Sequence, residues 1–175
     1  MRNILRFAAL CLVVALLAQT ALAQSAPKKG EKADLSFTAV DGTKVNLADY
    51  QGKLVVVDFW ATWCPPCMKE ADHMVKVNTQ YADKGLVMLG ISLDSDVAKM
   101  KTVAKAKGFT WLQYCDGKAG NCPLAKAWGV DSIPHTFLFG PDGTLLWDGH
   151  PAKMDGPIAD AMKDHPPKTE PATKP

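Results

Sequence analysis

Two cysteines separated by two prolines are the residues best suited to chemistry in this sequence, Cys64-Pro65-Pro66-Cys67. They stand between an apolar run and a segment expected to be helical, and a helix N-terminus stabilises negative charge. Cys64 should therefore be more thiolate at neutral pH than a free cysteine, and the thiolate is the species that attacks disulfides. Cys67, one turn further on, can resolve the mixed disulfide from within the same molecule. The spacing predicts a redox-active disulfide with two catalytic cysteines.

The prolines limit how strongly the thiolate is stabilised. Pro65 and Pro66 have no backbone N–H, so the N–H of Cys67 is the first main-chain donor available to Cys64. Two other uses of the pair remain open. A purely structural disulfide would close a very small loop and constrain little, and a metal site would need further ligands. His73, on the same expected helix, is predicted to lie on a solvated face.

An acidic residue interrupts the apolar run that precedes the cysteines. Asp58 follows three valines and precedes Phe59 and Trp60. Burial of a carboxyl group among apolar side chains is costly and raises its pKa. Two interpretations follow: Asp58 exchanges a proton with Cys67 and is a third catalytic residue, or it is a hydrogen-bonded aspartate of the core.

A second cysteine pair, Cys115 and Cys122, brackets a loop of six residues that contains two glycines. We predict an additional disulfide between them. The chain-entropy model assigns a loop of this size roughly 2–3 kcal/mol, which favours a stabilising clamp. The loop also leaves the same sheet edge as Cys64, so electron exchange with the first pair or a role in the substrate groove is the alternative. A four-cysteine zinc site is disfavoured because the spacing exceeds that of zinc knuckles.

The first residues have the pattern of an export signal. Arg2 and Arg6 precede an apolar run that ends in a small-x-small cleavage site at residues 21–23. We expect cleavage after Ala23, which discards Cys11. An uncleaved anchor is the alternative, although the run is shorter than the roughly 20 residues of a spanning helix. Export, to the bacterial periplasm, places the remaining cysteines where disulfides persist.

Loss of the signal removes both arginines of the chain and lowers the formal net charge from +2 to zero. Without a basic excess or guanidinium groups, nothing indicates recognition of nucleic acid or phosphate. The predicted organisation is a signal peptide at 1–23, a flexible linker at 24–33, one domain at 34–165 and a disordered tail at 166–175.

Apolar runs alternate with lysine-rich segments through the domain, which indicates βαβ units and a parallel core. Strands are predicted at 35–40, 43–47, 53–60, 86–93, 110–115, 136–139 and 144–147, and helices at 65–83, 96–107, 124–128 and 154–164. Asp41-Gly42 suits the tight turn of an opening hairpin. The pattern predicts an α/β fold with a central mixed sheet flanked by helices.

The segment from Val57 to Cys67 resembles the active-site stretch of thioredoxin-fold proteins. The opening hairpin, Gly52-Lys53 before the strand and the βα unit at 86–107 make the chain most similar to the exported TlpA/ResA-like thiol/disulfide oxidoreductases. The resemblance implies a thioredoxin-like fold with an N-terminal β-hairpin and an extra βα insertion. It also implies that Cys64 is the nucleophile and Cys67 the resolving cysteine.

The resemblance further implies a substrate site. Ile133-Pro134 corresponds to the cis-proline segment that pairs with the substrate backbone, and Trp63 to a ring that partly covers the redox site, so these three are candidate substrate-binding residues. Asp58 matches the buried acid of thioredoxin. His135 departs from the pattern, because a small or hydroxyl residue is usual after the cis-proline.

The implied activity is disulfide exchange with protein substrates, supported by a membrane or exported redox partner. The exported branch is more often reductive, as in cytochrome c maturation, although tens of millivolts decide the direction. A monomer without cofactor or metal is expected. One rival is a copper or other metal delivery protein that binds through Cys64, Cys67 and a histidine such as His135 or His150. A peroxiredoxin, the other rival, needs an arginine that the mature chain lacks.

Overall fold

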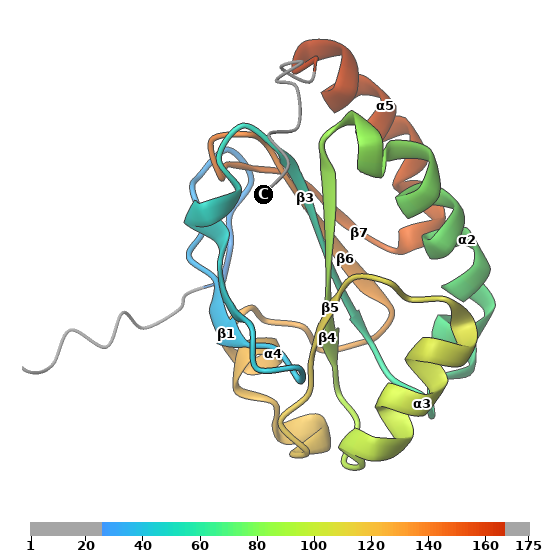
Figure 1. Ribbon diagram of the computed structural model, residues 1–175. Helices are drawn as coiled ribbons and strands as arrows, with labels where there is room; N and C mark the ends of the chain where they lie inside the picture. Colours follow the sequence, from blue (N-terminus) through green and yellow to red (C-terminus); the bar gives the residue numbers. More distant parts are fainter. Residues whose placement is uncertain (1–25, 167–175) are drawn as a thin grey trace, which may run out of the picture.

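A computed structural model of the chain describes residues 26–166. The predicted signal peptide, with Cys11, and residues 167–175 of the predicted tail lie outside the described residues. A five-stranded sheet in the order β5-β4-β3-β6-β7 forms the centre (Figure 1). Its strands are β3 (Leu54–Trp60), β4 (Leu86–Ser92), β5 (Leu112–Tyr114), β6 (His135–Phe139) and β7 (Leu145–Gly149). β3, β4 and β5 are parallel, whereas β6 and β7 are antiparallel to their neighbours.

Three helices cover one face of the sheet, and a hairpin with a short helix covers the other (Figure 1). The three are α2 (Pro65–Tyr81), α3 (Val97–Lys107) and α5 (Asp155–Asp164); opposite them lie β1 (Ser36–Thr38), β2 (Lys44–Asn46) and α4 (Pro123–Ala127). The 3-10 turns are η1 (Leu47–Tyr50), η2 (Ala82–Lys84), η3 (Ala119–Asn121) and η4 (Pro151–Lys153). Right-handed crossovers from β3 to β4 and from β4 to β5 step in one direction, which places α2 and α3 on the same face.

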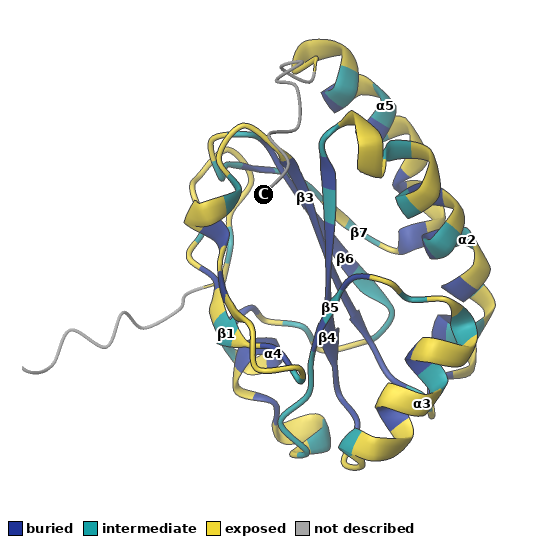
Figure 2. Cartoon of the chain, in the orientation of Figure 1, coloured by how far each residue is buried: buried dark blue, intermediate teal, exposed yellow. Residues whose placement is uncertain are grey.

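β3 is the centre of the core, with all seven residues buried. Its odd-numbered side chains pack in a hairpin-side cluster, which includes Val45, Leu47, Val57, Phe59, Trp128 and Phe137. Leu54 and Val56 pack in a helix-side cluster, which includes Met74, Val77, Leu138 and Ile158. Strand residues alternate between faces, so Asp58 points towards the helices. Figure 2 shows the central strands buried and the outer faces of the helices exposed.

One hydrogen bond inside the core links β3 to β5 across a glycine of β4, the strand that lies between them. Trp60 Nε1 of β3 donates to Gln113 Oε1 of β5 at 3.0 Å. To reach it, the Gln113 side chain crosses Gly90 of β4, where a Cβ atom would overlap the Gln113 amide group. A buried indole N–H without an acceptor would be costly. Gly90 is therefore required by the close approach of a side chain, since its backbone makes no turn.

The predicted fold class is confirmed, and every predicted strand and helix is present with ends displaced by a few residues. Two residues of the predicted flexible linker at 24–33 are held by backbone hydrogen bonds to the region around β7. Gly30 N donates to Leu145 O at 2.9 Å, and Ala33 N donates to Gly143 O at 3.1 Å. The reason is that β7 is an edge strand whose backbone groups are open to pairing. Between residues 26 and 166, no helix is long and apolar enough to cross a membrane.

Candidate active site

Cys64 and Cys67 form a disulfide where β3 passes into α2. Cys64 is the N-cap of α2, and its Sγ accepts a hydrogen bond from the backbone N–H of Cys67 at 3.1 Å. Pro65 and Pro66 occupy the first helical positions, where their missing N–H groups leave no helical bond unmade. The main-chain donor predicted from the two prolines is thus confirmed. The sulfurs lie deep, because Cys64 and Cys67 are only 3% and 4% exposed.

The segment beside the disulfide is the loop that precedes β6. The Ile133-Pro134 peptide bond is cis, and the Ile133 carbonyl oxygen lies 3.7 Å from Cys64 Sγ. Trp63, which is 56% exposed, is the only exposed large apolar side chain among the described residues. Its Nε1 donates to the Leu93 carbonyl at 3.3 Å, so the ring is held against the loop that follows β4. The structure thus brings the predicted substrate-binding residues to the edge of the sheet that carries the cysteines.

A buried carboxylate fixes the loop that leads into Cys64. Asp94, directly after β4, accepts hydrogen bonds from Thr62 N at 3.0 Å and Thr62 Oγ1 at 2.6 Å. Ser92 Oγ donates to the same carboxylate at 2.7 Å. We did not predict a role for Asp94 from the sequence. The feature that could have indicated one is an acidic residue that follows a buried strand at the sheet edge where Cys64 emerges.

Asp58 is buried on the α2 side of β3 and is 3% exposed. The pKa of its carboxyl is raised to about 7, chiefly by burial; a hydrogen bond from Thr136 opposes the rise, and the charge of Glu70 on α2 adds a smaller increase. Thr136 Oγ1 of β6 donates to Asp58 Oδ1 at 2.9 Å. Thr136 pairs with Asp58 across the β3–β6 ladder, a register that the sequence alone does not reveal. The raised pKa expected for this residue is confirmed.

His73 does not lie on a solvated face as predicted. It is half-buried, with Nδ1 3.2 Å from Glu70 Oε2 and Nε2 2.8 Å from Asp155 Oδ1. The prediction failed because Asp155 begins α5, which packs beside α2 although it is 82 residues away in sequence. His73 thus joins the two helices above the face on which Asp58 lies.

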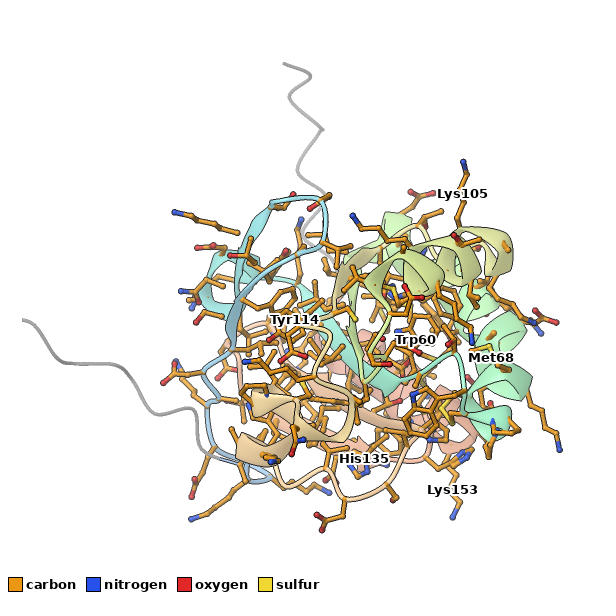
Figure 3. The ribbon with its side chains drawn as sticks, turned by 90° about the horizontal axis from the view of Figure 1, so that it is seen from below. Trp60, Met68, Lys105, Tyr114, His135 and Lys153 are labelled. Atoms are coloured by element: carbon orange, nitrogen blue, oxygen red, sulfur yellow. A yellow bond between two sulfur atoms is a disulfide. The ribbon has the colours of Figure 1, made fainter. Side chains whose placement is uncertain are left out.

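Cys115 and Cys122 are thiols in this structure, without the predicted additional disulfide. Cys115 is partly exposed, and its Sγ lies 3.4 Å from the Asp94 carbonyl oxygen, to which the thiol can donate. Cys122 is fully buried in the hairpin-side cluster. Figure 3 views this edge of the sheet, with Trp60 between Met68 of α2 on one side and Tyr114 of β5 on the other. Cys115 directly follows Tyr114, the last residue of β5, so the second cysteine pair begins at the C-terminal end of β5.

With this geometry in place, the comparisons with known proteins decide the family. The model of the AhpC/TSA family matches residues 29–147, more than half of the chain. The chain belongs to the AhpC/TSA family. The match spans the hairpin, both cysteine pairs and the sheet as far as β7.

Relatives of this AhpC/TSA chain are named as a thiol-disulfide oxidoreductase or as a thioredoxin-like protein. It is 31% identical to the thiol-disulfide oxidoreductase ResA of Bacillus thuringiensis over 66% of its own length and 65% of the length of that relative. The thioredoxin-like protein YneN of Bacillus subtilis is 33% identical, over 67% of this chain and 69% of YneN. The predicted TlpA/ResA-like resemblance is confirmed.

Solved structures agree with the fold of this AhpC/TSA member. A thiol-disulfide oxidoreductase from Bacteroides fragilis superposes with a TM-score of 0.66 at 25% identity, over 76% of this chain and 98% of that one. A thiol:disulfide interchange protein of the thioredoxin family from Chlorobium tepidum gives 0.64 at 25% identity, over 82% and 99%. The thioredoxin-like architecture expected from the sequence is confirmed.

The two histidines considered as metal ligands are engaged elsewhere in this AhpC/TSA chain. His135 Nε2 lies 3.3 Å from Asp148 Oδ2, and His150 Nδ1 accepts a hydrogen bond from Ala152 N at 3.3 Å. Across residues 26–166, no group of three or more histidine, cysteine or acidic side chains is placed to hold a metal ion.

Proposed function

We propose that this member of the AhpC/TSA family is an exported thiol/disulfide oxidoreductase that exchanges disulfides with protein substrates through Cys64 and Cys67. The observation that carries the proposal is the hydrogen bond from Cys67 N–H to Cys64 Sγ at the start of α2. Once the disulfide is reduced, this N–H and the helix N-terminus stabilise a thiolate on Cys64. The names of the ResA relatives support the same activity.

The reductive half-reaction begins on Cys64. Its thiolate attacks one sulfur of a substrate disulfide; that S–S bond breaks, and the first substrate thiolate leaves. The Cys67 thiolate then attacks Cys64 Sγ, the mixed disulfide breaks, and the second substrate thiolate leaves. The products are the Cys64–Cys67 disulfide found in the structure and a substrate reduced by two electrons.

Asp58 accepts the proton that Cys67 loses before it attacks. The carboxyl is buried on the side of β3 that faces α2, the helix that carries Cys67, and its pKa is about 7. A proton acceptor works best when its pKa lies near the operating pH. Resolution should therefore accelerate as the pH rises through 7, because Asp58 becomes a carboxylate.

The substrate backbone docks against Ile133 and Pro134, with the exposed Trp63 ring as a second contact. The Ile133 carbonyl oxygen is a main-chain acceptor that lies 3.7 Å from Cys64 Sγ. An exposed tryptophan is a typical anchor for a protein partner.

We also propose where the protein acts and in which direction electrons flow through it. The export signal at residues 1–23, cleaved after Ala23, delivers the domain to the periplasm. The protein acts there as a monomeric reductant, for example in cytochrome c maturation, and a membrane or exported partner reduces it again. Cell fractionation of the full chain tests the location, since cytoplasmic retention of the unprocessed chain would contradict export.

Insulin reduction and a redox titration test the activity. We expect the wild type to reduce insulin in the presence of dithiothreitol and Cys64→Ser to be inactive, with Cys115→Ser as the matched control. For a reductant, the Cys64/Cys67 potential should lie at or below about −230 mV, in the range of glutaredoxins and thioredoxin. A value near −180 mV, that of protein disulfide isomerase, would instead indicate an oxidant or isomerase.

No observation in the structure favours metal delivery or peroxide reduction. Both histidines named for metal delivery have other partners. The activating arginine of peroxide chemistry is absent from residues 24–175.

A further inference from the structure

The second cysteine pair is placed to react with itself. Cys115 follows β5, and the chain returns through η3 so that Cys122 N donates to Ala119 O at 3.0 Å. Cys122 belongs to the hairpin-side cluster, and Cys115 packs against the same cluster. The two cysteines thus stand at the two ends of a six-residue loop, with both side chains against one cluster.

The two thiols differ in access. Cys115 is partly exposed, whereas Cys122 is completely buried. A reagent in solution therefore meets Cys115 first, and Cys122 can react only with a sulfur that is already held at Cys115. This is the division of roles of an attacking and a resolving cysteine.

A carboxyl group with an unused oxygen lies beside them. Asp116 Oδ1 accepts a hydrogen bond from Lys118 N at 3.0 Å. Its Oδ2 is buried, and no donor in residues 26–166 bonds to it. The charge of Asp116 acts on both Cys122 and Tyr114. The pKa of Tyr114 is raised to about 12, first by burial, then by that charge and further by a side-chain hydrogen bond to the Asp116 carboxyl. A buried acceptor without a donor costs free energy, and a proton from Cys122 would satisfy it.

We propose that Cys115 and Cys122 are a second redox site, which closes reversibly to a disulfide by reaction with small-molecule disulfides such as oxidised glutathione. Cys115 is the attacking thiol, Cys122 the resolving thiol and Asp116 the acceptor of the Cys122 proton. The site carries its own nucleophile, resolving group and base, and none of these belongs to the Cys64/Cys67 site.

The electrons and protons balance as follows. The Cys115 thiolate, having released its proton to solvent, attacks one sulfur of oxidised glutathione, whose S–S bond breaks to release a glutathione thiolate. Cys122 gives its proton to Asp116 and attacks Cys115 Sγ, and the second glutathione thiolate leaves. Asp116 passes its proton to the second departing thiolate, and the first thiolate takes a proton from solvent. The protein has then lost two electrons and two protons, and one oxidised glutathione has become two reduced glutathione molecules.

Closure changes a contact to the first site. In the thiol form, Cys115 Sγ lies 3.4 Å from the Asp94 carbonyl oxygen, while the Asp94 carboxylate holds Thr62, two residues before Cys64. A disulfide leaves Cys115 without a proton to donate, so the Asp94 carbonyl loses that bond. This step rests on the proposed function, because only an active Cys64 would register the change.

The decisive experiment uses the Cys64→Ser/Cys67→Ser variant, which removes the first site. The variant is equilibrated in buffers of graded reduced and oxidised glutathione, and its free thiols are alkylated and counted by mass spectrometry. We expect both remaining thiols to disappear together and to return when the buffer is made reducing. Two thiols that stay free at every ratio, or one glutathione bound without closure, would overturn the proposal.

Two further changes in the same background test the assigned roles. Cys122→Ser should trap glutathione on Cys115, whereas Cys115→Ser should trap none. Asp116→Asn should slow closure roughly tenfold or more at neutral pH, and the exposed acid change Asp131→Asn is the matched control. Equal closure rates for the two acid variants would remove Asp116 from the mechanism.

The link to the first site has its own readout. Cys115→Ser keeps a donor for the Asp94 carbonyl, whereas Cys115→Val does not. In a Cys67→Ser background, the alkylation rates of Cys64 in these two variants should differ by roughly twofold to tenfold, the range of one hydrogen bond. Equal rates would disprove the coupling. The glutathione titration would still decide the second site, and insulin reduction would still decide the proposed function.

Discussion

The two cysteine pairs emerge from the same edge of the sheet, yet different structures hold them. Cys64 and Cys67 share the first turn of a 17-residue helix whose backbone already bonds one sulfur. Cys115 and Cys122 lie at the two ends of a loop, and Cys115 Sγ contacts the backbone carbonyl oxygen of Asp94. The first pair is found as a disulfide and the second as thiols.

The acidic residues beside the two cysteine pairs, Asp58 and Asp116, also differ in the structures that hold them. Asp58 is enclosed in the sheet and accepts a hydrogen bond from Thr136, whereas Asp116 belongs to a loop and has one oxygen without a donor. A helix and a sheet fix the first site before any substrate arrives, which lowers the cost of reaching the reactive geometry. A loop holds the second pair, and we propose that closure to a disulfide completes that site. Under the two proposals, the first site serves turnover and the second changes its redox state.

The largest effect on insulin reduction is expected from substitutions in the Cys64/Cys67 pair. The same loss from the Cys115/Cys122 pair would contradict the contrast between the two pairs. Cys64→Ser should lower insulin reduction to the uncatalysed background, because the attacking thiolate is lost. Cys67→Ser should accumulate mixed disulfides with the substrate, detected on non-reducing gels. Cys115→Ser should still turn over. Insulin reduction that survives Cys64→Ser would move the active site away from α2.

The next effect concerns the enclosed acid. The pKa of Asp58 is about 7 in the folded protein and near 4 when unfolded, so the folded state retains a proton between these values that the unfolded chain has released. Stability therefore falls as the pH rises from about 4 to 7. Asp58→Asn should abolish this fall and raise the free energy of unfolding of the oxidised protein at pH 8 by on the order of 2–4 kcal/mol.

Urea unfolding at several pH values measures this gain, and stopped-flow resolution of a mixed disulfide measures its cost. The same variant should resolve more slowly above pH 7, because the amide cannot accept a proton from Cys67. Glu31→Gln is a control, since Glu31 is exposed and far in sequence from either site. Unchanged stability and an unchanged resolution rate would make Asp58 an ordinary core residue.

A smaller effect sharpens the contrast between helix and loop. In the Cys64→Ser/Cys67→Ser background, closure of Cys115 and Cys122 by oxidised glutathione should raise the free energy of unfolding by roughly 2–3 kcal/mol, the chain-entropy value for a loop of this size. Adding Cys115→Ser/Cys122→Ser should remove the gain. If oxidation left stability unchanged in both proteins, the pair would not act as a clamp.

The smallest effect tests the hydrogen bond that distinguishes Asp58 from Asp116. Thr136→Val removes the donor to the Asp58 carboxylate, so the pKa of Asp58 should rise further. The pH profile of resolution should then move upward by about one pH unit. Thr136→Ser keeps the hydroxyl and should restore the wild-type profile. Coincident profiles for all three proteins would show that Thr136 does not affect Asp58.

The sequence was sufficient where a feature depends on neighbours along the chain. The strand at β3 follows from a continuous apolar run, and Asp41-Gly42 does form the hairpin turn, with Gly42 at a φ of 93° and Thr43 N bonded to Asp41 Oδ1 at 2.9 Å. The Cys67 N–H donor follows from the two prolines before it. These features require no knowledge of how distant segments meet.

The sequence was insufficient where a residue acts through a distant partner. Thr136 meets Asp58 only because β6 pairs with β3 in one register, 78 residues apart. Thr62 and Asp94 meet across 32 residues, and His73 meets Asp155 across 82. In each case the residue type suggests a partner, but the fold alone selects it.

The bond from Trp60 to Gln113 across Gly90 has a consequence for how this core can vary. Each residue is conditioned by the other two: any side chain at Gly90 displaces Gln113, and a displaced Gln113 leaves the indole of Trp60 without its acceptor. Each single replacement should therefore be harmful, whereas a joint replacement that shortens Gln113 and removes the indole N–H should cost much less than the sum of the single effects. Among homologous sequences, these three positions, from three adjacent strands, are expected to change together.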